Sequence, residues 1–445
     1  MGLLSRIRDR LLGRSSIEAG GRGRRWPNAG MSRPNVELLN RAALSGARAA
    51  WMTANYPYAR SIVDTWVTNL IGDGPAVRPV TSNKALKART VAIFGEFWRT
   101  CDVEGVLHLD AMLQAVARSL VIYGEAFVHM IADRDSGSLR LRIWGVDQVD
   151  RSLTRALANG GRIVAGIEFD ASGRRVAYHV TENADTHLVP AYAPRRVAAE
   201  DVVHLFEPIF PGQARGISWL APSATRLTEI DKLEDALLAK FNTSALFGGV
   251  FKKPDANDTT ILPTGPDGEP SLEPGAMIYA PPGYDVEFAD PPNAEGAVDF
   301  LRAQIRAAAA GAGIPYELMS GDLSQVSYIS GRLGLMEFRR RVIALQKGMF
   351  AGRLLGPIWR RLLLLEALSD RLPMAEALTV DAEFIFTGWS ALDPMKEMNA
   401  DIAAIKAGVK SRFEVIASRG RDVEAVDEEI AQDKRPAAQL EEEAA

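Results

Sequence analysis

Cysteine is nearly absent from this sequence, since Cys101 is the only one among 445 residues. A single thiol excludes an intrachain disulfide and a thiolate metal cluster, and it fits a reducing cytoplasm. Long apolar runs are also missing, because no stretch reaches the length that a transmembrane helix needs. The N-terminus lacks the apolar core of a signal peptide, since arginine interrupts it at positions 6, 8, 10 and 14. We therefore expect no membrane partner.

The residue patterns of common catalytic sites are missing too. A phosphate-binding P-loop needs a Gly-Lys pair, and none occurs; the segment 408–411 resembles the end of such a loop but lacks its upstream glycine. No GxSxG nucleophile motif is present. Five histidines never take the spacing of a metal site, and we interpret them as surface or core residues: His108, His129, His179, His187 and His204. We expect no enzyme activity, no cofactor and no metal.

An excess of positive charge is absent as well. The 52 Lys and Arg residues against 56 Asp and Glu give a net charge of -4, and the pI is near 5.9. Proteins that bind DNA tightly neutralise its phosphates and are normally basic. Tight DNA binding is therefore not expected, whereas a channel through which DNA slides tolerates this charge. Arginines dominate residues 1–40, which we interpret as a short amphipathic helix followed by a flexible basic arm. Acidic residues dominate the C-terminus.

What is present is an ordinary globular composition, with 47% hydrophobic residues, in a chain long enough for about two to four domains. Between residues 42 and 221, helix and strand patterns alternate, which predicts an α+β domain. Helices are expected at Ala59–Ile71 and His108–Tyr123, because glycines follow both. Strands are expected at Glu125–Ile131, Leu139–Val146, Ile163–Asp170 and Arg175–Thr181. The last two flank a turn at 171–174, which predicts a hairpin.

Two helical patterns then enclose a segment rich in Pro, Gly and Asp. The first begins at Pro222 and runs to about Asn242. The second lies at 294–312, and its apolar residues recur at spacings of three and four: Val298, Leu301, Ile305, Ala308 and Ala312. Strands are expected between the helices at Phe247–Phe251, Ala276–Ala280 and Val286–Phe288. The pattern predicts an antiparallel helical pair with a small β lobe at its tip.

A polar loop and a long helix follow. Glycines and a proline at 311–315 end the preceding helix, and the loop spans Ser320–Gly331. The next helix runs from about Arg332 past Phe350 with three surface arginines at 339–341. We expect the glycines at 348, 352 and 356 to let another backbone approach, and Gly356-Pro357 to kink or end the helix.

The C-terminal region is expected to contain one strand and several helices. The strand is Val380–Thr387. Asp393 and Pro394 are typical of the first two positions of a helix ending near Gly408, and 411–414 has capping-box spacing for another. Apolar residues at 423, 426 and 430 predict a short acidic helix.

Several motifs, taken in order, resemble those of lambda-family bacteriophage portal proteins. The segments Gly313–Tyr328 and Gly334–Arg341 look like the family signature. Other matching motifs are Asn55–Arg60, Val63–Gly74, Cys101–Gly105, Gly166–Asp170, His204–Pro208, Arg215–Pro222, Leu272–Gly275 and Val286–Pro292. The resemblance covers about residues 40–420.

This resemblance implies a portal-type ring subunit of the α+β class, with an α+β wing, a helical stem, a small β-containing clip and a helical C-terminal region. The implied divisions are a basic N-terminal arm at 1–40, a wing at 41–221, a stem helix at 222–243, a clip at 244–293, a returning stem helix at 294–313, a tunnel loop at 314–331, a long helix at 332–378, and a wing strand, crown helices and acidic tail at 379–445.

The implied function is that of a homo-oligomeric ring of about twelve copies at one capsid vertex. Double-stranded DNA would be packaged and ejected through it, and the terminase motor and the head-tail connector would dock on it. The implied partners are the terminase large subunit, the major capsid protein, head-tail connector proteins and DNA in transit. The chain would assemble in the bacterial host cytoplasm and reside in the virion.

The resemblance also motivates candidate DNA-contacting residues. Those in the tunnel loop are Ser324, Gln325, Ser327, Tyr328 and Arg332, and those in the clip are Lys252 and Lys253. Such contacts should be few and weakly basic, because each strong phosphate contact would slow the passage of DNA. Ordinary solvation of a surface loop is the alternative reading of the loop residues.

Two other functions stay open at this stage. A packaging enzyme such as an ATPase, nuclease or capsid protease is disfavoured by the missing motifs. A ring-forming minor capsid or adaptor protein without a role in DNA translocation is disfavoured by the predicted pair of helices with a small β lobe at its tip. The width and lining of a central hole would decide between the adaptor and the portal.

Overall fold

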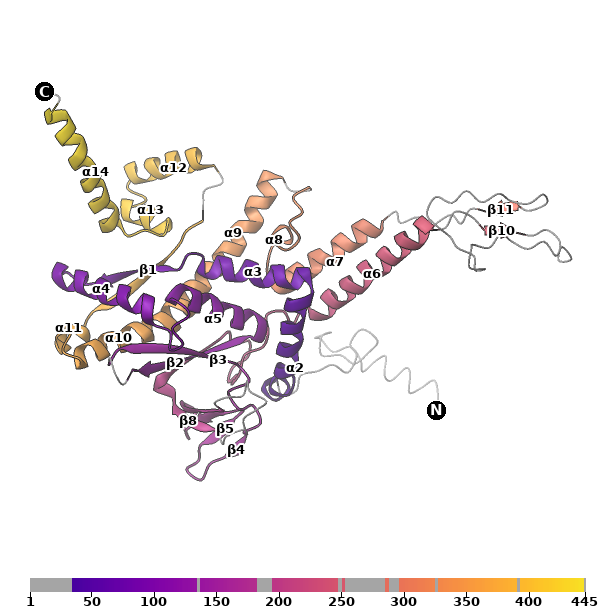
Figure 1. The fold of residues 1–445 in the computed structure, drawn as a ribbon, viewed down its shortest axis with the longest axis horizontal. Helices are drawn as coiled ribbons and strands as arrows, with labels where there is room; N and C mark the ends of the chain where they lie inside the picture. Colours follow the sequence, from indigo (N-terminus) through magenta and orange to yellow (C-terminus); the bar gives the residue numbers. More distant parts are fainter. Residues whose placement is uncertain are drawn as a thin grey trace, which may run out of the picture.

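The computed structural model describes residues 34–133, 137–181, 194–246, 250–252, 285–287, 296–324, 327–389 and 393–443. The predicted helix at the start of the N-terminal arm lies outside these residues. The described elements form a body of helices and sheets, from which one helical hairpin projects (Figure 1). Among the described helices, none has the length and apolar character needed to cross a membrane.

Four helices begin the body: α2 (Pro34–Asn55), α3 (Pro57–Ile71), α4 (Lys84–Thr100) and α5 (Leu109–Tyr123). The predictions of α3 and α5 are confirmed. Gly124 ends α5 in the left-handed region, and the imidazole of His108 caps its start by accepting from the N–H of Ala111. Helices α2 and α4 were not predicted, since α2 lies across the arm boundary placed at residue 40 and α4 has a weak apolar pattern.

Two antiparallel sheets follow. The first has the order β3-β2-β9, from β2 (Glu125–Ala132), β3 (Leu139–Trp144) and β9 (Val202–Phe206). The second has the order β4-β5-β6-β7-β8, from β4 (Arg155–Ala156), β5 (Arg162–Val164), β6 (Ile167–Phe169), β7 (Arg175–Val180) and β8 (Arg195–Ala198). A 3-10 turn, η2 (Ala199–Asp201), joins β8 to β9.

The prediction of one strand over 163–170 is wrong. Ala165 and Gly166 both have positive φ and make a turn, so β5 and β6 pair with each other as a hairpin. The predicted hairpin at 171–174 is confirmed between β6 and β7. The carboxylate of Asp170 closes that turn, because it accepts from the backbone N–H groups of Ser172 and Arg174.

The projecting hairpin consists of α6 (Ala224–Leu246) and α7 (Ala297–Ala312). The hydroxyl of Ser223 donates to the carbonyl of Ala308 over 2.6 Å, and Arg226 bonds Gln304, so the two helices run antiparallel as predicted. At the tip, β10 (Val250–Lys252) pairs antiparallel with β11 (Asp285–Glu287). These confirm part of the predicted lobe. The strand predicted at 276–280 lies outside the described residues.

After α7 the chain forms the short helix α8 (Tyr316–Ser320) and then α9 (Tyr328–Leu345). The polar loop is therefore shorter than predicted, since α8 ends at its first residue and α9 begins four residues before Arg332. Helical backbone continues through a π-helix, η3 (Gln346–Leu355), into α10 (Gly356–Leu368). Gly356 and Pro357 do not end the helix. They mark the return from π to α hydrogen bonding, and Pro357 stands in the first turn of α10.

The expected approach of another backbone to the three glycines is wrong within this chain. A Cβ built at Gly348 meets nothing within 4 Å. At Gly352 and Gly356 it would lie 3.3 Å from the carbonyl oxygens of Lys347 and Ala351, five residues earlier in the same helix. Glycine at these two positions thus relieves crowding inside the widened helix.

The chain then returns to the body. Helix α11 (Met374–Ala377) precedes β12 (Asp381–Phe386), which pairs antiparallel with β1 (Pro75–Val80) and confirms the predicted strand. A C-terminal module of α12 (Pro394–Lys406), α13 (Arg412–Ser418) and α14 (Val423–Glu443) completes the chain. Both predicted caps are confirmed, since the side chains of Asp393 and Ser411 accept from Lys396 and Glu414 N–H groups.

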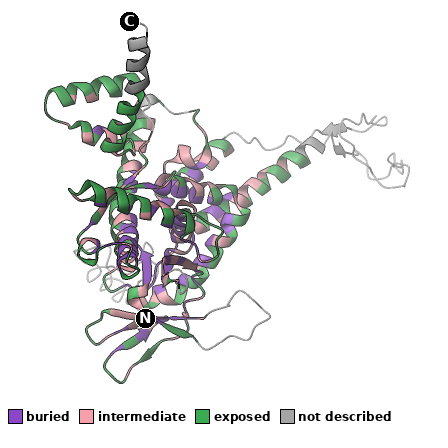
Figure 2. Cartoon of the chain, turned by 60° about the vertical axis from the view of Figure 1, so that its left-hand side comes forward, coloured by how far each residue is buried: buried purple, intermediate pink, exposed green. Residues whose placement is uncertain are grey.

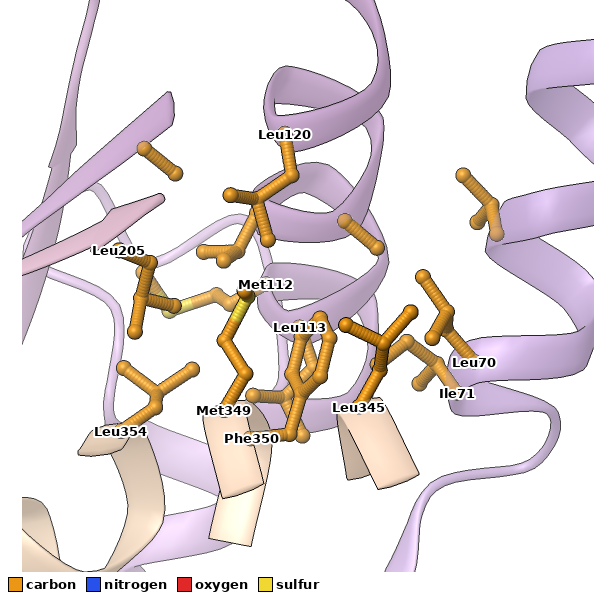
Figure 3. Packing of buried hydrophobic residues seen from close by; sticks show 14 of the residues in the cluster. Leu70, Ile71, Met112, Leu113, Leu120, Leu205, Leu345, Met349, Phe350 and Leu354 are labelled. Carbon is orange, nitrogen blue, oxygen red and sulfur yellow. The ribbon is translucent and has the colours of Figure 1, made fainter. Parts of the chain in front are cut away.

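One large apolar core joins most of the body. Helix α5 packs against β2 and against α3, and the segment of α9 and η3 contacts α3 and β9, so that α5 lies between β9 and α3 (Figure 3). The labelled residues of this core are Leu70, Ile71, Met112, Leu113, Leu120, Leu205, Leu345, Met349, Phe350 and Leu354. A smaller core lies between the two sheets, around Phe127 and Tyr178. The base of the hairpin belongs to the larger core, which includes Leu227 of α6 and Ile305 of α7.

Candidate functional site

The loop after α8 is fixed at its start by Asp322. One carboxylate oxygen accepts from the N–H of Ser324 over 3.0 Å and from its hydroxyl over 2.6 Å. The other accepts from the Tyr316 hydroxyl over 2.8 Å and lies 3.5 Å from Arg302 of α7. The hydrogen bonds from Ser324, together with that from Tyr316, lower the pKa of Asp322 to about 2. An ionised Asp322 therefore ties the loop to α7 and α8 at neutral pH.

Helix α8 is itself held by α3. The hydroxyl of Ser61 donates to the carbonyl oxygen of Met319 over 2.8 Å, and that of Thr65 to Leu318 over 3.3 Å. The side chain of Met319 is buried beside them. These contacts use carbonyl groups at the end of a short helix that have no helical partner, so α3 sets where the loop begins.

Helices α3, α7 and α9 meet at Trp66. Its indole N–H donates to the carbonyl oxygen of Ala312, the last residue of α7, over 3.0 Å. The Trp66 ring packs edge-on against Trp219 and Phe338, with centroids 5.0 and 5.1 Å away. The guanidinium of Arg341 lies 5.1 Å from the same ring. Helix α7 is therefore anchored at one buried point of the body.

The arginines of α9 differ in their surroundings. The guanidinium of Arg339 lies 5.2 Å from the ring of Trp389, and burial lowers the pKa of Arg339. Arg341 pairs with Glu207 at 3.7 Å. The expected surface position is confirmed for Arg340 and Arg341, which are exposed, whereas Arg339 is half-buried. Arg332 and Arg340 are exposed, and Arg332 lies one turn from the loop.

The structure places the predicted site residues in two groups. Ser324 and Ser327 are exposed in the loop, Tyr328 is the first residue of α9, and Arg332 follows it. Lys252 ends β10 opposite Asp285, at the far tip of the hairpin from α8 (Figure 1). Gln325 and Lys253 lie outside the described residues. The hydroxyl of Ser324 is already engaged, by Asp322.

Sequence reasoning missed a buried charged cluster around Glu125. Its carboxylate contacts Arg215 Nη2 at 2.8 Å, Arg151 Nη2 at 2.6 Å and His204 Nε2 at 3.1 Å, and it accepts from the N–H of Gly216 at 2.9 Å. The side chains of Glu125, His204 and Arg215 are at most 1% exposed. The centre of the cluster therefore lies inside the protein, and Arg151, whose side chain is 19% exposed, lies at its edge.

Arg215 links the two sheets. Besides Glu125 of β2, its guanidinium donates to the carbonyl oxygens of Val146 and Ala165 at 3.1 and 2.8 Å. Ala165 belongs to the turn between β5 and β6, so one side chain contacts both sheets.

Two glycines bring the backbone segments of this cluster together. A Cβ on Gly124 would lie 2.0 Å from the backbone of Ile217, and one on Gly216 would lie 2.1 Å from the backbone of Gly124. Only glycine permits so close an approach. The signal that could have found the cluster is therefore a charged residue next to a glycine in both segments, Gly124-Glu125 and Arg215-Gly216.

Three groups of the cluster have perturbed pKa values, and burial lowers the pKa of Arg151 to about 10. Burial raises the pKa of the Glu125 carboxyl, but Arg215 and His204 reverse this effect and hold that pKa well below its usual range. Burial lowers the pKa of His204 to about 4, against the opposing effect of Glu125. His204 is therefore neutral at pH 7 and its Nε2–H donates to Glu125. This arrangement stabilises a fixed ion pair.

Three kinds of likeness bear on identity. The sequence matches the family described as phage portal protein, lambda family, over residues 19–346. This is well over half of the chain. The chain belongs to the lambda family of phage portal proteins.

Curated portal proteins support this membership. The chain is similar to a probable portal protein of Halomonas phage phiHAP-1, with 26% identity over 87% of this chain and 79% of that protein. It is also similar to portal protein B of Escherichia phage lambda, with 23% identity over 92% of this chain and 86% of that protein. The portal proteins matched thus align with nearly the full length of the chain.

A solved structure shares the fold of this portal-family chain. A chain from the neck of an empty GTA particle, computed with C6 symmetry, superposes with a TM-score of 0.50 at 15% identity. The match covers 93% of this chain and 99% of that one. The α+β class, expected from alternating patterns, is confirmed as a portal-type fold.

Proposed function

We propose that this chain forms a closed homo-oligomeric ring at one capsid vertex, through which double-stranded DNA is packaged and ejected. The observation that carries the proposal is the α6 and α7 hairpin of a lambda-family portal chain. This hairpin projects from the body (Figure 2), and large apolar side chains on it are exposed. Leu238, Phe241 and Phe300 are 60%, 56% and 56% exposed. Copies arranged around an axis would cover such residues with identical contacts.

The elements take the roles of a portal subunit in this proposal. Residues 41–221 and β12 form the wing, α6 and α7 the stem, β10 and β11 part of the clip, and the segment at 314–331 the tunnel loop. The C-terminal module at 393–443 forms the crown. The contacts of α3 with α8 and α7 support this division, because they fix the stem and the loop to the wing at Trp66 and Ser61.

The proposed DNA-facing groups are Ser324, Gln325, Ser327, Tyr328 and Arg332 in the loop, with Lys252 and Lys253 in the clip. Asp322 supports the role of the loop, because its ionised carboxylate offsets the positive charge of Arg302 and keeps the surroundings of Ser324 lightly charged. Light charge suits passage, since each phosphate that is strongly neutralised slows sliding.

The proposed partners follow from the same ring. We infer docking of the terminase large subunit and of head-tail connector proteins, contact with the major capsid protein, and assembly in the bacterial host cytoplasm before residence in the virion. The ring comprises about twelve copies in this proposal. Its role is structural and not enzymatic.

Electron microscopy of the purified full-length chain tests the proposal. We expect closed rings with an open central hole. A stable monomer, or a ring with a filled centre, would contradict it. In a packaging reaction with the cognate terminase, omission of the ring should abolish DNA uptake. A ring that assembles but is dispensable for uptake would instead favour a minor capsid or adaptor protein.

A further inference from the structure

Helix α12 carries a line of apolar residues that its own chain leaves uncovered. Met395, Met398, Ile402 and Ile405 recur at spacings of three and four, and Val409 continues the line just after the helix. This is the spacing of a helix that packs lengthwise against another helix. The exposed fractions of the five residues are 69%, 44%, 44%, 37% and 80%. Figure 2 shows most of the C-terminal module in the colour of exposed residues.

The contacts of α12 with its own chain are few. None of its residues is buried. Asp401 pairs with Lys410 at 2.9 Å and with Arg419 at 3.6 Å, and a cleft of about 600 Å³ separates part of the helix from Trp389. A helix of 13 residues is marginal in water without packing on one face. Its stability in the assembled protein therefore needs a further contact.

Met398 borders the cleft beside Trp389, and the other residues of the uncovered line are not among those lining it. Asp401 and Ala404, the partly buried residues of α12, lie about a third of a turn around the helix from the line, at roughly 100° per residue. The chain therefore covers one side of α12 and leaves the apolar line on another. Lys406 borders that line and is exposed.

A complementary surface exists on α14 of the same chain. Its first turn is fixed to the body, because Lys87 of α4 pairs with both Asp422 and Glu424. Ile430 of α14 is 40% exposed, and it lies about one turn after Val426 on the same face of the helix. Acidic residues border this face: Asp427 and Glu429 pair with Arg412 and Arg421 of the same chain, and Asp433 is exposed and opposite in sign to Lys406.

We propose that the apolar line of α12 in one copy packs against α14 of the adjacent copy in the ring. This inference rests on the proposed function, because it requires ring neighbours. Each copy offers α12 as one surface and α14 as the other, so the contact is head-to-tail and repeats around a closed ring. The three-four spacing of the line suits a partner that is itself a helix. DNA does not suit it as a partner, because few cations lie along the line.

A photo-reactive amino acid placed at residue 402 of the full-length chain tests the contact. We expect purified rings to cross-link between copies, with the cross-linked peptide falling in 423–443. The matched control is the same amino acid at residue 403, an exposed position about a third of a turn off the line. It should give at least fivefold less cross-linking between copies.

A second variant tests the same contact through assembly. Ile402→Glu with Ile405→Glu should lower the fraction of chain in rings at least tenfold at a fixed concentration, while the circular dichroism of the chain stays near that of the parent. Intact rings in which residue 402 cross-links no better than residue 403 would overturn the inference and leave the portal proposal standing. Failure of the parent chain to form rings would overturn both.

Discussion

Arg215 Nη2 lies 2.8 Å from Glu125 Oε1 in a part of the protein that solvent does not reach. The pair connects β2 to the turn between β5 and β6 through the carbonyl groups that Arg215 also contacts. An ion pair of this kind gives little net stability over an apolar pair, but removal of one partner leaves a buried charge uncompensated.

Arg215→Met should therefore destabilise the chain by about 3–5 kcal/mol, because it leaves the buried Glu125 carboxylate with Arg151 as its remaining cation and removes the donor to the carbonyl oxygens of Val146 and Ala165. Chemical denaturation of the dissociated chain measures this change. The double variant Glu125→Gln with Arg215→Met should recover part of the loss. Arg196→Met is the control, since the Arg196 side chain that pairs with Glu168 is about half exposed and its loss should cost under about 1 kcal/mol. Equal losses for Arg215→Met and Arg196→Met would contradict the assignment.

The His204 and Glu125 pKa values predict how stability depends on pH. The pKa of His204 is about 4 in the folded chain, against 6.5 for an unperturbed histidine. Between these values the unfolded chain binds the extra proton, so stability falls as the pH falls from 6.5 to 4. The lowered pKa of Glu125 acts in the same direction at the acid end of this range, because its stabilising effect is lost as the carboxylate is protonated.

We expect a loss of about 1 kcal/mol per pH unit from His204 over that window, measured by denaturation at several pH values. His204→Gln keeps a donor for Glu125 but does not titrate, so its stability should change less between pH 6.5 and 4. Parallel curves for the parent and His204→Gln would show that His204 does not carry the dependence.

Gly313 and Gly334 give a matched pair of glycine substitutions. Gly313 has φ of +71° at the end of α7, and a Cβ there would lie 2.3 Å from the Arg341 guanidinium. Gly313→Ala should destabilise the chain by about 1–2 kcal/mol. Gly334 lies within α9, where a Cβ meets nothing within 4 Å. Gly334→Ala should stabilise by about 0.5–1 kcal/mol. Thermal unfolding tests both, and a common sign for the two would refute the reasoning.

Arg332 tests the role of the loop. If passing DNA approaches the start of α9, Arg332→Glu places a negative charge beside the phosphates and should reduce packaging of DNA at least tenfold without changing ring assembly. Arg340→Glu makes the same charge change on the same helix, about two turns farther from the loop. It should have a smaller effect. Equal effects in a packaging assay would place the DNA away from 320–332.

The sequence by itself determined the elements whose signals are local. Bonds and contacts within a few residues determine the caps at Asp393 and Ser411, the glycine ends of α5 and α7, and the three-four spacing of apolar residues in α7. The order of the motifs was enough to indicate the family. Local signals of this kind are independent of how distant segments later pack.

Only the tertiary structure decided features that join distant segments. The glycines of η3 were expected to admit another backbone, but they accommodate a π-helix whose register depends on packing of the flanking buried residues. The contact of Trp66 with Ala312 spans 246 positions, and that of Glu125 with Arg215 spans 90. No periodicity encodes such pairs, because burial of the charge and the partner that offsets it arise only when the two segments meet in the folded chain.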